Sequence, residues 1–120
     1  MKINIININE IHIAEIISDD IVIKSTQDVL DLMADCRYQG AGKIIIHEKN
    51  IIPEFFDLKT GIAGEVLQKF TTYRVQLAIV GDYLNYTSKS LRDFIYESNK
   101  HGRISFVNTV EEAKEQMMKF

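Results

Sequence analysis

Apolar residues follow two different periods along this chain of 120 residues. Residues 2–8 and 11–17 are rich in isoleucine, as β-strands are, and the two residues between them suffice for a hairpin turn. Residues 44–46 and 75–80 are continuous apolar runs, which are typical of strands buried on both faces of a sheet. Residues 103–107 are predicted to form the last strand. The pattern predicts five strands, of which the first two form an N-terminal hairpin.

Four other segments have the period of a helix, because their inward-facing positions recur every three or four residues. These positions are Val29, Leu32, Met33 and Cys36; Ile62, Ala63, Val66, Leu67 and Phe70; Leu91, Phe94, Ile95 and Ser98; and Val110, Ala113, Met117 and Phe120. Each segment follows residues able to cap a helix N-terminus, and these are Ser25 or Thr26, Thr60, Thr87 or Ser88, and Thr109.

The predicted order is ββαβαβαβα, and this alternation assigns the chain to the α/β class. Each crossover helix returns the chain in the same direction, so we expect a mostly parallel five-stranded sheet with an antiparallel hairpin, and four helices. Residues 1–120 suffice for a single domain with one core. The longest connection, residues 47–59, has no clear period, and connections of this length are usually functional.

Composition excludes several classes of function. Hydrophobic residues make up 46% of the chain, but no apolar run reaches the roughly 18 residues of a membrane span. The net charge of -3 has interspersed signs, so we expect neither nucleic acid nor a membrane as a partner. Residues 1–7 are interpreted as a strand and not as a signal peptide. The single cysteine, Cys36, cannot form an internal disulfide, which favours a cytoplasmic protein.

The candidate site follows from the predicted sheet, because ligands of open α/β sheets bind outside the carboxyl ends of the parallel strands. Glu48, Lys49 and Asn108 belong to this edge. The residues that we take as the candidate site are His47, Asp57, Lys59, Thr60, Gly61, Asp82, Tyr83, Tyr86, Thr87 and Lys89.

Two kinds of small-molecule chemistry are open to this edge. N–H groups at the helix start near Thr60, with Lys59 beside them, can hold a phosphate or a carboxylate. His47 can act as a general base if Asp57 or Asp82 orients it, but no nucleophile motif accompanies it.

Tyr83 and Tyr86 suit a protein interface instead, because tyrosine combines a flat apolar ring with a polar tip. The three histidines and the cysteine have none of the spacings of a metal site, so we expect no metal. The segment from Gly61 to Gly64 lacks the rest of a dinucleotide-binding motif, so we also expect no cofactor.

Four motifs carry a resemblance to one bacterial family. They are Lys-Ile-Ile-Ile-His at 43–47, Phe-Phe-Asp-Leu-Lys-Thr-Gly at 55–61, Ala-Ile-Val-Gly-Asp at 78–82, and Tyr-Thr-Ser-Lys-Ser-Leu-Arg-Asp-Phe-Ile-Tyr-Glu-Ser-Asn at 86–99. Over its whole length the sequence resembles the uncharacterised single-domain proteins catalogued as domain of unknown function 4180. That family has no established activity, so the resemblance implies no mechanism.

The order of elements is also similar to that of the STAS domain of the anti-sigma-factor antagonists. In that family an Asp-Ser-Ser-Gly-like sequence opens a helix and carries the regulatory phosphoserine. Residues 56–62 occupy the equivalent place, so the resemblance implies Thr60 as the phosphoacceptor. The serine is missing here, Lys59 intrudes, and the preceding loop is longer. We favour a role of Thr60 as helix cap alone.

We therefore expect a non-enzymatic cytoplasmic regulatory module with a STAS-like fold that binds a protein partner at this edge. The alternative is a small-ligand- or anion-binding protein, or an enzyme, that uses the same edge. A self-associating homodimer is a third hypothesis. A concave pocket that holds His47, Asp57 and Asp82 would favour the alternative, whereas a flat or convex edge would favour the partner module.

Overall fold

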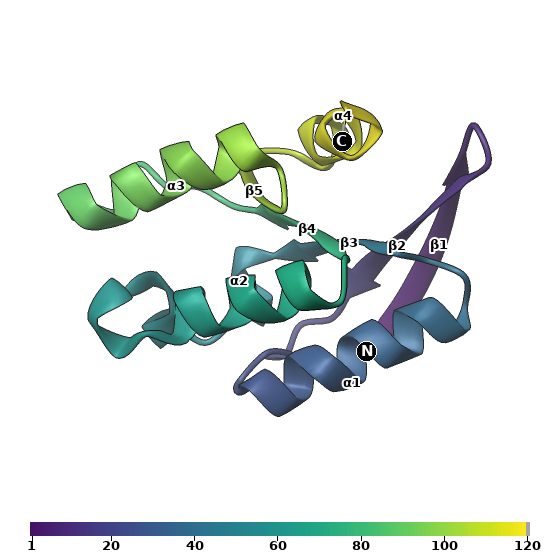
Figure 1. Cartoon of the computed structure of the whole chain (residues 1–120), viewed down its shortest axis with the longest axis horizontal. Coiled ribbons are helices and arrows are strands. Elements are labelled where there is room, and N and C mark those ends of the chain that lie inside the picture. Colours follow the sequence, from purple (N-terminus) through teal and green to yellow (C-terminus); the bar gives the residue numbers. More distant parts are fainter. Residues whose placement is uncertain (120) are drawn as a thin grey trace.

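The computed structural model describes residues 1–119. Its five strands form one sheet in the order β1-β2-β3-β4-β5 (Figure 1). The strands are β1 (Lys2–Ile8), β2 (Ile11–Ile17), β3 (Lys43–His47), β4 (Gln76–Val80) and β5 (Ile104–Val107). β1 pairs antiparallel with β2, and β2 to β5 are mutually parallel. The predicted mixed sheet with an N-terminal hairpin is confirmed.

The four predicted helices are also present, as α1 (Thr26–Tyr38), α2 (Ile62–Thr72), α3 (Lys89–His101) and α4 (Val110–Lys119). Ser25 caps α1 by accepting the N–H of Asp28 at 3.3 Å, and Ser88 caps α3 by accepting the N–H of Leu91 at 3.2 Å. The α/β class and the order ββαβαβαβα are therefore confirmed, while the likeness to STAS domains remains a prediction from that order. Phe120, predicted on the buried side of α4, lies outside the described residues.

The helices divide unequally between the two faces of the sheet. Each crossover moves the chain one strand further across the sheet, so connections of one hand place α1, α2 and α3 on the same face. Ile44 and Ile46 of β3 belong to the core on that face. Ile45 packs on the other face, with Ala113 and Met117 of α4. All three isoleucines are fully buried, which confirms β3 as the predicted central strand.

The hairpin between β1 and β2 turns through two residues, Asn9 and Glu10. Their φ angles are 51° and 70°, and a type I′ turn needs a positive φ at both central positions. The predicted hairpin is therefore confirmed, although neither residue is the glycine that such turns favour.

The long connection after β3 has more structure than its sequence indicated. It contains three 3-10 turns, η1 (Glu48–Asn50), η2 (Pro53–Phe56) and η3 (Leu58–Thr60). Turns this short do not repeat often enough to show a period in the sequence. Between η1 and η2, Ile51 forms a parallel bridge with Ile23, which ties this connection to the segment before α1.

The prediction that Thr60 is the N-cap of α2 was wrong. The cap is Gly61, whose φ of 79° lies in the left-handed region that glycine adopts most easily. The Thr60 hydroxyl lies 2.8 Å from the carbonyl oxygens of both Glu54 and Asp57, and it accepts the N–H of Ile62 at 3.3 Å. Thr60 therefore closes the last 3-10 turn, one residue before the helix cap.

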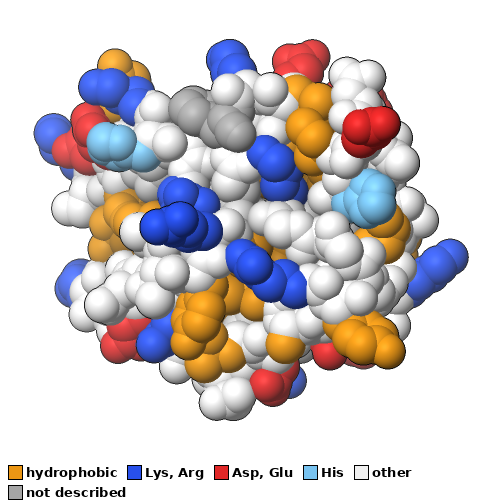
Figure 2. All heavy atoms as spheres, turned by 45° about the vertical axis from the view of Figure 1, so that its right-hand side comes forward, with side chains coloured by type: hydrophobic (Ala, Val, Ile, Leu, Met, Phe, Trp, Pro, Cys, Tyr) orange, Lys and Arg blue, Asp and Glu red, His pale blue; other side chains and the backbone are white. Residues whose placement is uncertain are grey.

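Basic side chains gather at the end of the molecule where the helices finish. Arg37, Lys69 and Lys100 lie in the last turns of α1, α2 and α3. The Arg37 guanidinium donates to the carbonyl oxygen of Tyr73 at 2.5 Å. Figure 2, which brings this side forward, shows Lys and Arg side chains across the middle of the face. Cations near helix C-termini are stabilised by the helix dipole, and this explains why basic side chains gather at this end of the molecule.

Asn50 holds the segment before α1 against the end of β3. Its side chain is fully buried, and its amide group donates to the carbonyl oxygens of Ser18 at 2.8 Å and Asp20 at 2.9 Å. Its side-chain oxygen accepts the N–H of His47 at 3.3 Å. The Asn50 main-chain oxygen accepts the N–H groups of residues 22 and 23. One residue thus satisfies polar groups from two segments about thirty residues apart in the sequence.

We predict that Asn50→Ala lowers the free energy of unfolding by about 2–4 kcal/mol, because it leaves partly buried N–H and C=O groups without partners. Chemical denaturation followed by circular dichroism measures this loss. The exposed Asn85 provides the control, since Asn85→Ala should change stability by less than about 0.5 kcal/mol. Equal stabilities of the two variants would contradict this role of Asn50.

Candidate functional site

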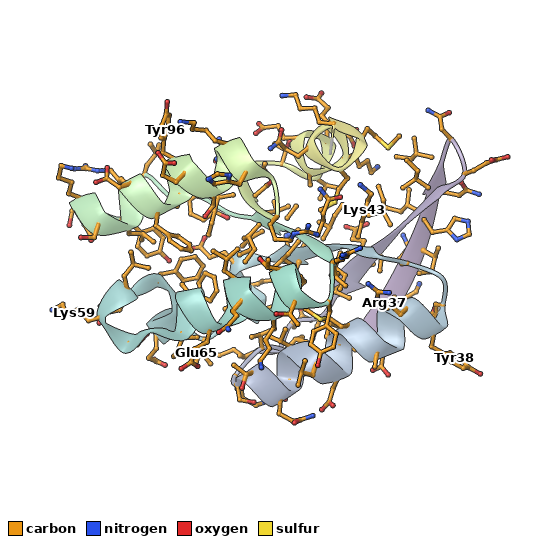
Figure 3. All side chains as sticks on the ribbon, in the orientation of Figure 1. Arg37, Tyr38, Lys43, Lys59, Glu65 and Tyr96 are labelled. Carbon is orange, nitrogen blue, oxygen red and sulfur yellow. The ribbon has the colours of Figure 1, made fainter. Side chains whose placement is uncertain are left out.

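The connections after β3 and β4 lie together at the carboxyl ends of the parallel strands. We call residues 48–60 and 81–88 the rim. In Figure 3, Lys59 marks this end of the molecule, and Tyr38 marks the opposite end. The rim is the edge at which the sequence placed the candidate site.

Glu48 joins the two halves of the rim. Its carboxylate accepts the hydroxyl of Tyr86, and its Oε1 accepts the N–H of Asp82 at 3.3 Å. A Cβ at Gly81 would lie 2.5 Å from Oε1 of Glu48 and 2.7 Å from its Cβ. Gly81 is therefore what allows the Glu48 side chain to cross over the end of β4. The sequence placed Glu48 at this edge but assigned it no role.

The loop after β4 is held by its own hydrogen bonds. The Asp82 carboxylate accepts the N–H of Leu84 at 3.1 Å, and the Tyr86 N–H donates to the carbonyl oxygen of Tyr83 at 3.2 Å. The hydroxyl of Tyr83 donates to the carbonyl oxygen of Ile79 inside β4. Residues on both sides of Leu84 are thus fixed to the sheet.

Stacked rings support this loop from below. The rings of Phe56 and Tyr86 stack with their centroids 5.2 Å apart. Tyr83 meets Phe106 edge to face at 5.5 Å, and Phe55 meets Phe56 in the same way at 4.9 Å. These contacts connect both halves of the rim to β5 and add packing energy to the hydrogen bonds.

Leu84 is held in solvent on top of this support. Its side chain is 91% exposed, although the tyrosines at positions 83 and 86 are half-buried. The sequence indicated the tyrosines as interface residues and missed Leu84, because an isolated leucine in a loop has no period that separates an exposed position from a buried one.

A shallow hollow lies at the rim, with a volume of about 300 Å³. The residues that line it are Ile21, Glu48, Lys49, Ile51, Pro53, Phe56 and Tyr86. His47, Asp57 and Asp82 do not line it, so it is not the concave pocket that would combine a base with an orienting carboxylate.

His47 and Asp57 belong to segments that pack against opposite faces of the sheet. Residues alternate between the faces of a strand, so His47 points to the same face as Ile45, which is the face covered by α4. Phe56, directly before Asp57, packs in the core on the other face. His47 and Asp57 therefore do not form the pair that a general base would need.

The remaining candidates are exposed and make local contacts. The Asp57 carboxylate accepts the N–H of Lys59 at 3.2 Å, within the η3 turn. The Lys59 side chain points away from the rest of the protein (Figure 3). Lys89 pairs with Asp93 at 2.8 Å on the outside of α3, and Thr87 is exposed beside it. Of the ten candidates, the structure brings together Asp82, Tyr83 and Tyr86, with Glu48 at the centre.

Both tyrosines are held protonated. Burial, the hydrogen bond to Glu48 and the charge of Glu48 raise the pKa of Tyr86 above its usual range. Burial, followed by the charge of Glu48, raises the pKa of Tyr83 in the same direction. The folded protein therefore keeps these protons at a pH at which the unfolded chain releases them.

We predict that the protein loses stability above about pH 10, where tyrosines of the unfolded chain ionise while Tyr83 and Tyr86 remain protonated. The loss is at most about 1.4 kcal/mol per pH unit for each such tyrosine. Tyr86→Phe removes one of these groups, so its unfolding free energy should fall less steeply with pH. Denaturation curves between about pH 8 and 11 test this. Parallel curves for the variant and the wild type would contradict it.

We also predict that Gly81→Ala displaces Glu48 and destabilises the protein by about 1–3 kcal/mol, because the new Cβ overlaps its side chain. Gly64 is the matched control. It lies in α2, and a Cβ there would have no atom within 4 Å. Gly64→Ala should stabilise the protein by up to about 1 kcal/mol, because alanine is the better helix former. Thermal unfolding of both variants measures the difference in sign, and a stable Gly81→Ala variant would contradict the crossing of Glu48.

Within the described residues, no three His, Cys, Asp or Glu side chains come together to hold a metal ion. No described helix has the length and apolar character needed to cross a membrane.

No curated protein matches the chain, and no solved structure matches it. The model of the family described as "Domain of unknown function (DUF4180)" matches residues 8–117, and the chain belongs to this family.

Proposed function

We propose that the protein is a non-enzymatic regulatory module that binds a protein partner through the rim, with Leu84 as the central apolar contact. The observation that carries this proposal is the 91% exposure of Leu84 on a loop whose neighbours are fixed. A side chain that is already held in place loses little conformational freedom on binding, so its burial contributes more to affinity.

The surroundings of Leu84 suit a protein partner. Ile21, which is 39% exposed, and the exposed Pro53 border the shallow hollow on the same edge. Tyr86 lines this hollow, and its N–H donates to the carbonyl oxygen of Tyr83 in the loop of Leu84. Aromatic and apolar groups with polar groups around them are the usual composition of an interface core and its margin.

The alternative of a small-ligand- or anion-binding protein, or an enzyme, has less support from the geometry. It needs a concave site with His47, Asp57 and Asp82, and the hollow at the rim contains none of them. Lys59, the proposed anion contact, extends away from the rest of the protein (Figure 3).

Two further parts of the proposal are secondary. Phosphorylation of Thr60 would put a charge of about -2 at the start of α2 and would disrupt the bonds of its hydroxyl to residues 54 and 57. A cytoplasmic location agrees with the single cysteine, Cys36, which is buried and forms no disulfide.

The partner is sought by affinity purification of the tagged full chain from its native cells, followed by mass spectrometry. We expect Leu84→Ser to lose the proteins that the wild type retains. Tyr38→Ser is the matched control, because Tyr38 is 93% exposed and lies at the opposite end of the molecule (Figure 3). Both substitutions are at the surface and should leave the fold unchanged.

With the purified partner, Leu84→Ser should raise the dissociation constant at least about tenfold, and Tyr38→Ser should leave it unchanged. Isothermal titration calorimetry measures both values. Retention of the same proteins by the wild type and by Leu84→Ser would contradict the role of the rim.

A further inference from the structure

The two edge strands of the sheet differ in what their outward main-chain groups bind. At the β5 edge, the side chain of Asn99 from α3 binds the main chain of Phe106, with its oxygen accepting the N–H at 2.7 Å and its amide donating to the carbonyl at 3.2 Å. Asn99 thus occupies the position of a further strand and blocks that edge. β1, the strand at the other edge, is seven residues long and pairs on one side only.

The hairpin register shows which groups of β1 face outward. In a two-residue hairpin the residues that flank the turn, here Ile8 and Ile11, form a hydrogen-bonded pair, and such pairs then recur at every second position. Even-numbered residues of β1 therefore bond to β2. The N–H and C=O groups of Ile3, Ile5 and Asn7 point away from the sheet. An exposed row of this kind is a template for another strand.

We propose that β1 is the interface of a homodimer, in which two copies of β1 pair antiparallel about a two-fold axis at Ile5. In this register Ile5 lies opposite Ile5 of the second copy, and Ile3 lies opposite Asn7. All three pairs are of the hydrogen-bonded kind, so every outward group of both strands finds a partner. A shift of the register by two residues would leave only two pairs among these three residues and one outward-facing residue of each strand without a partner.

The side chains agree with this register. Lys2 lies opposite Ile8 of the second copy and next to the turn that carries Glu10, so the charges at this position are complementary. Lys2 is already paired with Ile17, which is 46% exposed. Its aliphatic stem would cover these isoleucines while the ammonium reaches Glu10. The two sheets would become one continuous sheet with the two rims at opposite ends.

Single cysteines test both the dimer and its register. Ile5→Cys places the two new thiols on paired residues about 5.5 Å apart at Cα, which is within disulfide range. Mild oxidation should therefore give a covalent dimer. Asn7→Cys places its thiols about 13 Å apart along the strands, which is out of range. The native Cys36 is buried and is common to both variants.

Asn7→Pro tests the hydrogen bonds, because it removes an outward N–H without changing the bonds between β1 and β2. It should raise the dimer dissociation constant at least about tenfold in sedimentation equilibrium, since two bonds are lost per dimer. Asn7→Ala keeps the N–H and should leave the constant unchanged. Circular dichroism confirms that each variant is folded. A wild type that stays monomeric at all soluble concentrations would overturn the proposal, as would cross-linking of Asn7→Cys in preference to Ile5→Cys.

Discussion

The turn that follows the central strand determines how the connections of this protein are arranged. Within the three residues of η1, Asn50 binds the carbonyls of residues 18 and 20, and Glu48 binds the loop after β4. The first contact fixes the chain before α1, and the second fixes the chain before α3. Because β3 is buried on both faces, the turn itself is placed by the core. One polar side chain of the turn thus contacts each of these two connections, beside the contacts that each makes on its own.

The contacts of Glu48 also hold the rim in place. Glu48 fixes Tyr86, and the stacked rings of residues 56, 83 and 86 extend the contact to β5. Gly81 is required because the Glu48 side chain passes where a Cβ would be. A loop of this length would otherwise be mobile, and an exposed leucine on a mobile loop would lose more entropy on binding. The same contacts that stabilise the fold therefore also hold the loop of Leu84 in place, which is what the proposed role of Leu84 requires.

The order of the strands has a separate consequence for the edges. Strands that follow one another across the sheet leave the first strand and the last strand as its edges. α3 follows the β5 edge closely enough for Asn99 to bind it, whereas β1 belongs to a hairpin and has no helix of its own. The topology thus produces one edge that Asn99 blocks and one edge whose outward groups bond to no strand of the described chain, and it separates the β1 edge from the rim.

Much of the fold could be predicted from the sequence, because period and length are local properties. The continuous run at residues 44–46 indicated a central strand, and the spacing of Val29, Leu32, Met33 and Cys36 indicated the buried side of α1. Those predictions are confirmed. The continuous run did not predict the orientation of His47. A strand that is apolar on both faces does not show on which face of the sheet the next residue lies.

The sequence by itself determined the class, the order of elements and the edge at which polar and aromatic residues collect. Only the tertiary structure decided which of those residues meet. Glu48 reaches a tyrosine 38 positions away, and Asn50 reaches carbonyls more than two dozen positions away. Such pairs depend on the turn geometry and on the packing of three separate connections, and neither is written in the period of any one segment. The exposure of Leu84 was decided in the same way, by neighbours that hold its loop and leave its side chain in water.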